Sequence, residues 1–385
     1  MSNTQKSRTY DGHYPHIFNE CRIGSITLPN RTVFPAWQLN YANTDGTVSE
    51  KLMKFHTDLA HGGCGLIFTG AAVVSADGIP FDRVMRVDTN STIPGLKKLL
   101  SAIKMQGTVP GIQLVHYGRQ SSTTVSGNVL MAPSAIPCPV MSLYDPQYGV
   151  REMTMEDIGA IRQAFIAAAE RSAEAGAQVV EVHACHGYLL NEFLSPYSNK
   201  RTDAYGGSVE NRARLIVEIV SGIRYRLKDA VAISLRVSGD EFVVDGLKPA
   251  DFALFVPLFE KAGIDMLNVA AGVYESMERI VPPKKLGIAP HVHIPAEIKR
   301  YTHVPVCAVG SILSLETAES IISSGKADLC ALGRAQMADP ALVRKSGEGK
   351  EAEIRKCKHC NSCTFWTTGD PEVYCSVNPD YQKPV

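Results

Sequence analysis

The sequence alternates short apolar segments with longer amphipathic ones, and this alternation constrains the fold more than any other feature. The apolar segments have the length of strands, and most of the segments between them place apolar residues at helical spacing. We expect strands at residues 32–36, 65–69, 109–115, 179–182, 232–237, 266–269, 305–309 and 328–332. Eight strands that alternate with helices, without a Gly-x-Gly-x-x-Gly motif in the first turn, favour a (β/α)8 TIM barrel of the α/β class over a doubly wound sheet.

The segments between these strands supply the helices and the irregular regions. Helices are expected at residues 49–61, 93–106, 154–175, 208–227, 249–262, 293–301 and 314–324. A short hairpin is expected at residues 17–28, before the first barrel strand. Residues 118–151 lack a clear period and predict a long loop, which we expect to shape a ligand pocket together with residues 273–293.

Length and charge exclude several classes of protein. The chain has 385 residues, 45% of them hydrophobic, which suits one large barrel core. Lys plus Arg and Asp plus Glu both number 39, and no run of like charges would attract nucleic acid or a membrane surface. The first residues are polar, and no apolar stretch approaches the roughly 20 residues that span a bilayer. We therefore expect a cytoplasmic protein.

Three polar side chains follow the strand at 179–182, where barrel enzymes carry their active sites. They are His183, His186 and Tyr188. The two imidazoles can donate hydrogen bonds to one carbonyl oxygen, and the phenol can protonate a neighbouring atom. Taken alone, a His-x-x-His pair is as typical of a buried structural histidine or a structural zinc site as it is of a catalytic pair.

The other strands are followed by residues that suit a bound heterocycle with a phosphate. Glycines after the last two strands favour phosphate binding by backbone amides, and the arginines at strand ends can offset negative charge. Gln113 offers a donor and an acceptor to the edge of a ring such as a flavin pyrimidine. The candidate cofactor residues are Pro35, Ala36, Trp37, Gln38, Ala71, Gln113, Arg236, Gly310, Ser311, Gly333 and Arg334.

Four cysteines crowd near the C-terminus, whereas the other six are scattered, several of them in apolar segments. In a reducing compartment this crowd indicates metal ligation rather than disulfides. Cys357, Cys360, Cys363 and Cys375 have spacings that a [4Fe–4S] cluster accepts, and an all-cysteine zinc site is the alternative. We favour the cluster, with His359 as a neighbour of the ligands or an exposed residue. We accordingly predict a barrel over residues 1–350 and a cluster-binding segment over residues 351–385.

Several segments together resemble the FMN-containing Old Yellow Enzyme family, whose fold is a flavin barrel. The resemblance covers about residues 17–350 and is carried by residues 30–31, 113–119, 183–196, 199–212 and 332–334. It implies that His183 and His186 bind the carbonyl oxygen of the substrate. It also implies that Tyr188 protonates the α carbon while reduced flavin delivers hydride to the β carbon.

The resemblance also implies positions around FMN. Gln113 and Arg236 match residues at the flavin ring, Ala36 and Ala71 border it, and the phosphate site corresponds to Gly310, Ser311, Gly333 and Arg334. Two departures stand out. Trp37 and Gln38 replace the usual Met followed by Thr or Cys after the first strand, so Gln38 occupies the position that tunes the flavin in the family. Tyr117 replaces a small residue.

The cysteine segment resembles the iron–sulfur branch of the family, which includes 2,4-dienoyl-CoA reductase, enoate reductases and trimethylamine dehydrogenase. This implies an FMN and [4Fe–4S] dependent ene-reductase that acts on an enoyl-CoA, an aryl-derived CoA thioester or a cyclic enone. The alternatives are an amine dehydrogenase, favoured by the cysteine spacing, and a noncatalytic electron-transfer subunit. Against an amine dehydrogenase stand His183 and Gln38, where such enzymes carry Tyr and a flavin-linking Cys, and the lack of an evident aromatic bowl in a chain with two tryptophans.

The relatives in this branch continue into a further dinucleotide domain, whereas this sequence stops at Val385. We therefore expect the cluster to exchange electrons with an external protein such as a ferredoxin, an electron-transfer flavoprotein or a reductase subunit. We also expect a homo-oligomer.

Overall fold

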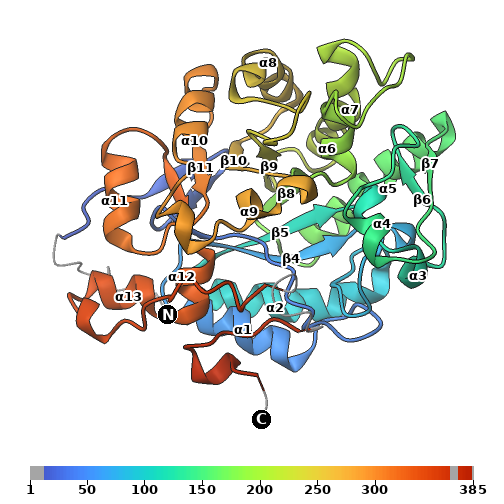
Figure 1. Ribbon diagram of the computed structural model, residues 1–385. Coiled ribbons are helices and arrows are strands. Elements are labelled where there is room, and N and C mark those ends of the chain that lie inside the picture. Colours follow the sequence, from blue (N-terminus) through green and yellow to red (C-terminus); the bar gives the residue numbers. More distant parts are fainter. Residues whose placement is uncertain (1–12, 365–371, 384–385) are drawn as a thin grey trace.

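Eight parallel strands close into a barrel at the centre of the molecule (Figure 1). The computed structural model describes residues 13–364 and 372–383. The barrel consists of β3 (Thr32–Phe34), β4 (Leu66–Val73), β5 (Val109–Val115), β8 (Val179–Ala184), β9 (Ala232–Ser238), β10 (Met266–Ala270), β11 (Val306–Val309) and β12 (Leu329–Ala331). Each strand pairs in parallel with the next in the chain, and β12 closes the ring on β3. The predicted (β/α)8 barrel is confirmed.

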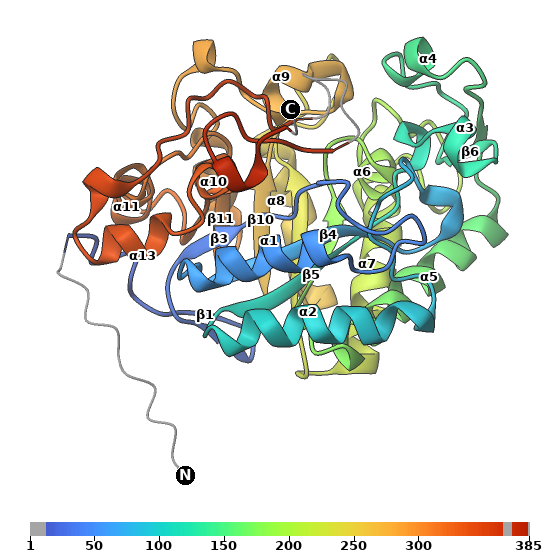
Figure 2. The same cartoon turned by 90° about the horizontal axis from the view of Figure 1, so that it is seen from below.

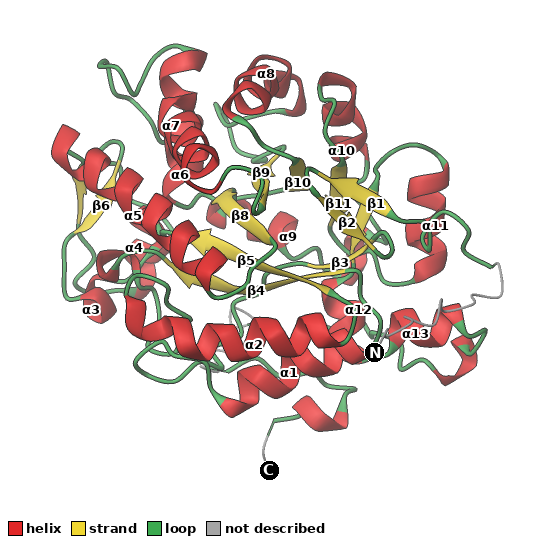
Figure 3. Cartoon of the chain, turned by 180° about the vertical axis from the view of Figure 1, so that it is seen from behind, coloured by secondary structure: helices red, strands yellow, loops and turns green. Residues whose placement is uncertain are grey.

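Helices surround the strands on the outside of the barrel (Figure 3). The larger ones are α1 (Glu50–His61), α2 (Ile93–Met105), α5 (Met155–Glu174), α7 (Val209–Leu227), α8 (Phe252–Ala262) and α11 (Leu315–Ser323). The shorter ones are α6 (Leu189–Leu194), α10 (His293–Ile298), α12 (Gly333–Ala338) and α13 (Leu342–Gly347). Helices α1 and α2 lie side by side along one flank (Figure 2). Side-chain oxygens of Ser49, Thr154, Ser208 and Ser314 accept hydrogen bonds from the first turns of their helices, which explains why these helices begin where they do.

A hairpin closes one end of the barrel, which leaves the other end for ligands. Strands β1 (Cys21–Ile23) and β2 (Ile26–Leu28) pair antiparallel, as predicted. Their buried side chains join one apolar cluster with residues at the N-terminal ends of the barrel strands, such as Val33, Leu66 and Leu329. The C-terminal ends of the strands therefore face the opposite, open side.

The predicted long loop at residues 118–151 contains more structure than its sequence suggested. Within it lie α3 (Thr123–Ser126), α4 (Met141–Tyr144) and β6 (Leu130–Ala132), and β6 pairs in parallel with β7 (Val150–Glu152). These elements are three or four residues long and too short to show a sequence period, so the expectation of an irregular loop was wrong for them. Asp145 ties the region together by accepting hydrogen bonds from the hydroxyls of Ser122 and Thr124.

The cysteine segment folds back over the barrel loop that follows β3. The backbone N–H of Val373 donates to Leu39 at 3.2 Å, and the hydroxyl of Tyr381 donates to Asp58 on α1 at 2.7 Å. The six scattered cysteines are all buried, as their apolar surroundings predicted. In the described ranges, no helix combines the length and apolar character needed to cross a membrane.

Candidate active site

A cavity at the C-terminal ends of the strands encloses about 1170 Å³, including open solvent at its mouth. All the residues predicted from the sequence to act on substrate or to bind cofactor line this one cavity. They are His183, His186 and Tyr188, together with Pro35, Ala36, Trp37, Gln38, Ala71, Gln113, Arg236, Gly310, Ser311, Gly333 and Arg334. The barrel topology thus brings together residues as far apart in the chain as Pro35 and Arg334.

The three candidate catalytic rings lie edge to face at one wall of this cavity. His183 belongs to β8, and its ring centroid lies 5.4 Å from that of His186 and 5.0 Å from that of Tyr188. His186 has a left-handed backbone (φ 60°), which turns the chain so that its ring comes back toward His183. Its backbone N–H donates to Ser238 Oγ at 2.8 Å, and its carbonyl accepts from Gln120 Nε2 at 2.7 Å. The turn is therefore held by the last residue of β9 and by the segment that follows β5.

Burial sets the protonation of these groups. It lowers the pKa of both His183 and His186 well below the ordinary value, and the positive charge of Arg236 lowers them further. Burial raises the pKa of Tyr188 well above the ordinary value. At neutral pH the imidazoles are uncharged, each with one N–H to donate, and the phenol keeps its proton.

The same histidines form a potential metal site with Cys185, because one ligand atom from each residue lies within 4.8 Å of the others. Burial, however, raises the pKa of the wholly buried Cys185 thiol far above its ordinary value. Metals bind the thiolate, so a bound ion would first have to displace this proton. The arrangement therefore suits hydrogen bonding by the imidazoles better than it suits metal ligation.

Gln113 and Arg236 occupy the floor of the cavity. Gln113 Nε2 donates to Glu181 at 2.7 Å, and Glu181 also accepts from Ser234 Oγ at 2.8 Å and Asn268 Nδ2 at 2.7 Å. Because a carboxylate only accepts, Glu181 directs the amide nitrogen of Gln113 toward itself and the amide oxygen away. Glu181 was missed by the sequence analysis, although a charged residue inside the run Val179-Val-Glu-Val was a usable signal.

The remaining polar atoms of the floor and the far end of the cavity suit an anion. Within the described structure, the buried Nε of Arg236 has no hydrogen-bond partner, and Nη1 donates to the carbonyl of Ala36 at 3.3 Å. Arg334 is only 8% exposed and donates to Ser311 Oγ and to the carbonyl of Pro282. Gly310 and Ser311 both have positive φ, 123° and 52°, and form a tight turn after β11. Two buried guanidinium groups with such a turn fit a phosphate-bearing heterocycle such as FMN.

The aromatic wall of the cavity was not foreseen. Tyr117, Tyr188 and Tyr274 meet there, with ring centroids 4.4 Å apart for the first pair and 5.7 Å apart for the second. The hydroxyl of Tyr117 donates to Gln38 Oε1 at 3.0 Å, so two departures from the usual family sequence contact each other. Phe81 also lines the cavity. The expectation that the cavity lacks an aromatic bowl rested on the small number of tryptophans in the chain. Tyrosines from three different loops supply the aromatic wall instead.

The comparison with known proteins identifies the family. The family described as NADH:flavin oxidoreductase / NADH oxidase matches residues 16–353. The chain belongs to this family. The resemblance to the Old Yellow Enzyme family of flavin oxidoreductases is thereby confirmed.

Among relatives in this family, the NADH oxidase of Thermoanaerobacter brockii is 37% identical over 371 residues, which cover 95% of this chain and 56% of the relative. A solved complex of 2-naphthoyl-CoA reductase with 2-naphthoyl-CoA has a TM-score of 0.89 at 29% identity, covering 95% of this chain and 57% of the other. The histamine dehydrogenase of Rhizobium sp. 4-9 has a TM-score of 0.86 at 29% identity, covering 96% and 53%. The chain thus spans about half the length of these three proteins.

In this member of the NADH:flavin oxidoreductase family, Cys357, Cys360 and Cys363 lie near Arg334, which lines the cavity. Cys363 and Cys375 are buried, Cys357 is half-buried and Cys360 is exposed, and the four lie close enough to interact electrostatically. The alternative that His359 is exposed was wrong, because this residue is only 6% exposed and its Nε2 lies 3.1 Å from Ser311 Oγ. Its role as a neighbour of cluster ligands stays a prediction.

Proposed function

We propose that this protein is an FMN and [4Fe–4S] dependent ene-reductase, which reduces a C=C bond conjugated to a carbonyl. The observation that carries the proposal is the convergence of two neutral imidazoles and one protonated phenol on a cavity with arginines at its floor and far end. The similarity to 2-naphthoyl-CoA reductase supports a CoA thioester as one substrate class. Enoyl-CoA, aryl-derived CoA thioesters and cyclic enones share the required chemistry.

In this proposal the three rings act on the carbonyl oxygen and on the α carbon of the substrate. N–H groups of His183 and His186 donate to the substrate carbonyl oxygen and stabilise the negative charge that develops there. Tyr188 gives its proton to the α carbon. FMN, when bound, supplies the hydride for the β carbon. Because the imidazoles are uncharged, they polarise the oxygen without protonating it, and the tyrosine remains the proton donor.

The residues proposed to hold FMN follow from the shape and charge of the cavity. The ring would lie against Pro35, Ala36 and Ala71, with Trp37 and Gln38 at its edge. Gln113, oriented by Glu181, would face the pyrimidine end together with Arg236. The phosphate would lie at Gly310, Ser311, Gly333 and Arg334.

Cys357, Cys360, Cys363 and Cys375 are proposed to bind the [4Fe–4S] cluster. Because Cys360 is exposed, an edge of this cluster would lie near the surface. An electron donor could reach it there, either as a separate electron-transfer protein or as a further segment of a longer chain. Iron and acid-labile sulfide analysis of the purified protein tests the cluster independently of any substrate, and zinc without iron would disprove it.

Amine oxidation is the second candidate. The tyrosine wall with Trp37 and Phe81 favours it, because aromatic faces attract cations, and the similarity to histamine dehydrogenase agrees. The charges favour the ene-reductase instead. Among the described residues that line the cavity, Arg236 and Arg334 are cationic and none is a carboxylate, so a protonated amine would meet positive charge.

An anaerobic absorbance experiment separates the two functions. The protein is reduced with dithionite and mixed with 2-cyclohexenone or crotonyl-CoA, while oxidised protein is mixed with histamine or trimethylamine. Reoxidation of the flavin by an alkene is the expected result. Bleaching of the oxidised flavin by an amine, with no response to either alkene, would replace the ene-reductase proposal with amine oxidation.

A further inference from the structure

Tyr274 contacts the candidate proton donor at its reactive atom. The hydroxyl oxygens of Tyr274 and Tyr188 lie 3.2 Å apart, and either can be the donor of the hydrogen bond. Tyr274 is 4% exposed and lies in the loop after β10, whereas Tyr188 follows β8. The contact therefore joins two loops whose strands are not neighbours in the barrel.

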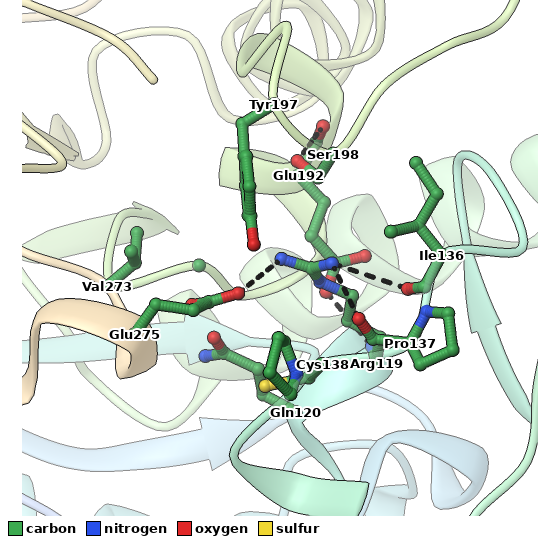
Figure 4. A network of polar contacts seen from close by, with 12 residues as sticks. Arg119, Gln120, Ile136, Pro137, Cys138, Glu192, Tyr197, Ser198, Val273 and Glu275 are labelled. Carbon is green, nitrogen blue, oxygen red and sulfur yellow. Dashed lines mark hydrogen bonds and ion pairs between the residues drawn. The ribbon is translucent and has the colours of Figure 1, made fainter. Parts of the chain in front are cut away.

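The residues on either side of Tyr274 are both anchored. Val273 forms an isolated parallel bridge with His186, the second candidate catalytic histidine. Glu275 accepts a hydrogen bond from Arg119 Nη2 at 3.1 Å, and Figure 4 shows this ion pair at the centre of a polar network. Both anchors come from other βα loops, so the backbone at Tyr274 is fixed relative to the catalytic wall.

The network in Figure 4 also fixes Arg119 itself. Its Nη1 donates to the carbonyls of Ile136 and Pro137, each at 3.3 Å, and its guanidinium lies 5.4 Å from the ring centroid of Tyr197. Arg119 is 2% exposed, so its ion pair with Glu275 is shielded from water. A buried, multiply bonded arginine is a rigid support for the loop that carries Tyr274.

We infer that Tyr274 is a positioning residue that donates a hydrogen bond to Tyr188 once Tyr188 has given up its proton. The inference rests on the proposed function, in which the enolate electron pair forms the new C–H bond with that proton. The electrons of the broken O–H bond stay on the Tyr188 oxygen as a phenolate. A phenolate has no proton to donate, so the bond between the two oxygens must then run from Tyr274 to Tyr188. Hydrogen bonding to a charged form stabilises it and so eases the proton transfer.

Tyr117 offers a matched comparison within the same wall. Its ring centroid is closer to that of Tyr188, at 4.4 Å, but its hydroxyl donates to Gln38. Tyr117→Phe removes a neighbouring hydroxyl that makes no hydrogen bond to Tyr188, whereas Tyr274→Phe removes one that does. If the two variants differ in the ionisation of Tyr188, the difference is due to the hydrogen bond and not to the packing of the rings.

The first experiment measures the ionisation of Tyr188 in the holoenzyme without any substrate. Residue 188 is replaced by 2,3,5-trifluorotyrosine, whose fluorines bring the phenol into a measurable pH range, and its titration is followed by ¹⁹F NMR. Tyr274→Phe is expected to lower the ionisation constant about 10- to 100-fold, as for the loss of one hydrogen bond to a charged group. Tyr117→Phe is expected to leave it within about 3-fold. An unchanged constant in Tyr274→Phe, or an equal fall in both variants, would overturn the inference.

The second experiment measures the proton transfer during turnover. In Tyr274→Phe, reoxidation of the reduced flavin by 2-cyclohexenone should slow about 10- to 100-fold with a larger solvent deuterium isotope effect. A slower rate with an unchanged isotope effect would contradict a role in proton transfer. If the ionisation constant falls as expected but no enone reoxidises the wild-type protein, the proposed function fails while the hydrogen bond to Tyr188 stands.

Discussion

Glu192 is a buried carboxyl whose ionisation should make the stability of the protein depend on pH. It lies on α6, the helix that begins directly after Tyr188, and is 1% exposed. Oε1 accepts the backbone N–H of Arg119 at 2.9 Å, while Oε2 has no hydrogen-bond partner among the described residues. Burial raises the pKa of Glu192 from 4.5 to about 8, although Arg119 lowers it and Glu275 adds a smaller raising effect.

The sign of the effect follows from these two pKa values. Between pH 4.5 and about 8 the folded protein holds one proton more on Glu192 than the unfolded chain does. The free energy of unfolding should therefore fall as pH rises, by about 1.4 kcal/mol per pH unit from this group alone. From pH 5.5 to 7.5 the loss is about 3 kcal/mol. The loss ends above pH 8, where both states are ionised.

The substitution Glu192→Gln isolates this contribution. The amide keeps an acceptor for the N–H of Arg119 but has no proton to lose in this range. Urea unfolding of the holoenzyme at pH 5.5 and 7.5 should show that the variant loses about 3 kcal/mol less than the wild type between the two conditions. Glu174→Gln, at an exposed position at the end of α5, is the control and should follow the wild type. If the wild type and Glu192→Gln lost the same unfolding free energy between pH 5.5 and 7.5, Glu192 would not be the group that holds the extra proton.

Two further substitutions test the cofactor sites. Glu181→Gln should weaken FMN binding about 10-fold. Glu181 accepts hydrogen bonds from Gln113, Ser234 and Asn268, and the amide nitrogen of a glutamine cannot accept any of them. Fluorescence titration of the apoprotein with FMN checks this, and unchanged affinity would contradict a role for Glu181 in orienting Gln113. Cys363→Ser should lower iron and acid-labile sulfide content several-fold, because a hydroxyl is a poor cluster ligand. Full iron content in that variant would remove Cys363 from the proposed ligands.

The barrel was predictable because its strands are buried on both faces and stand out as apolar runs. The pattern of β4 is buried at every position, as are those of β5, β8 and β9. Barrel topology then places every residue after a strand at one end, so residues as distant as Gln38 and Arg334 could be assigned to one cavity from sequence order alone. That step needs only the order of the strands and no knowledge of how the loops pack.

Contacts between loops were not predictable on the same basis. Arg119 and Glu275 are 156 residues apart, and Tyr188 and Tyr274 are 86 apart. No local period or spacing pairs them, because their meeting depends on how the region at 118–151 packs against the loop after β10. The short elements in that region were missed for the same reason, since tertiary contacts rather than propensity stabilise them.

Carboxyl groups near the cavity lie behind the residues that line it and accept hydrogen bonds from amide side chains. Glu181 accepts from Gln113 and thereby orients an amide that lines the cavity. Glu241 does the same one layer behind the histidines, since it accepts from Asn191 Nδ2 at 2.7 Å while Asn191 Oδ1 accepts the backbone N–H of Gly187 at 2.7 Å. In both cases the carboxyl group does not line the cavity, and it accepts a hydrogen bond from a neutral amide side chain.

This arrangement keeps the interior of the cavity positive. Arg236 and Arg334 line it. Burial raises the pKa of Glu181, although Arg236 lowers it, and Glu181 lies behind Gln113 and does not line the cavity. Glu192 is protonated at neutral pH and adds no negative charge. A positive interior favours an anionic cofactor and an oxygen that becomes negative during reaction, and it disfavours a cationic amine. Because these carboxyl groups are kept out of the cavity, its charge favours reduction of an activated alkene. This reason is independent of the three candidate catalytic rings.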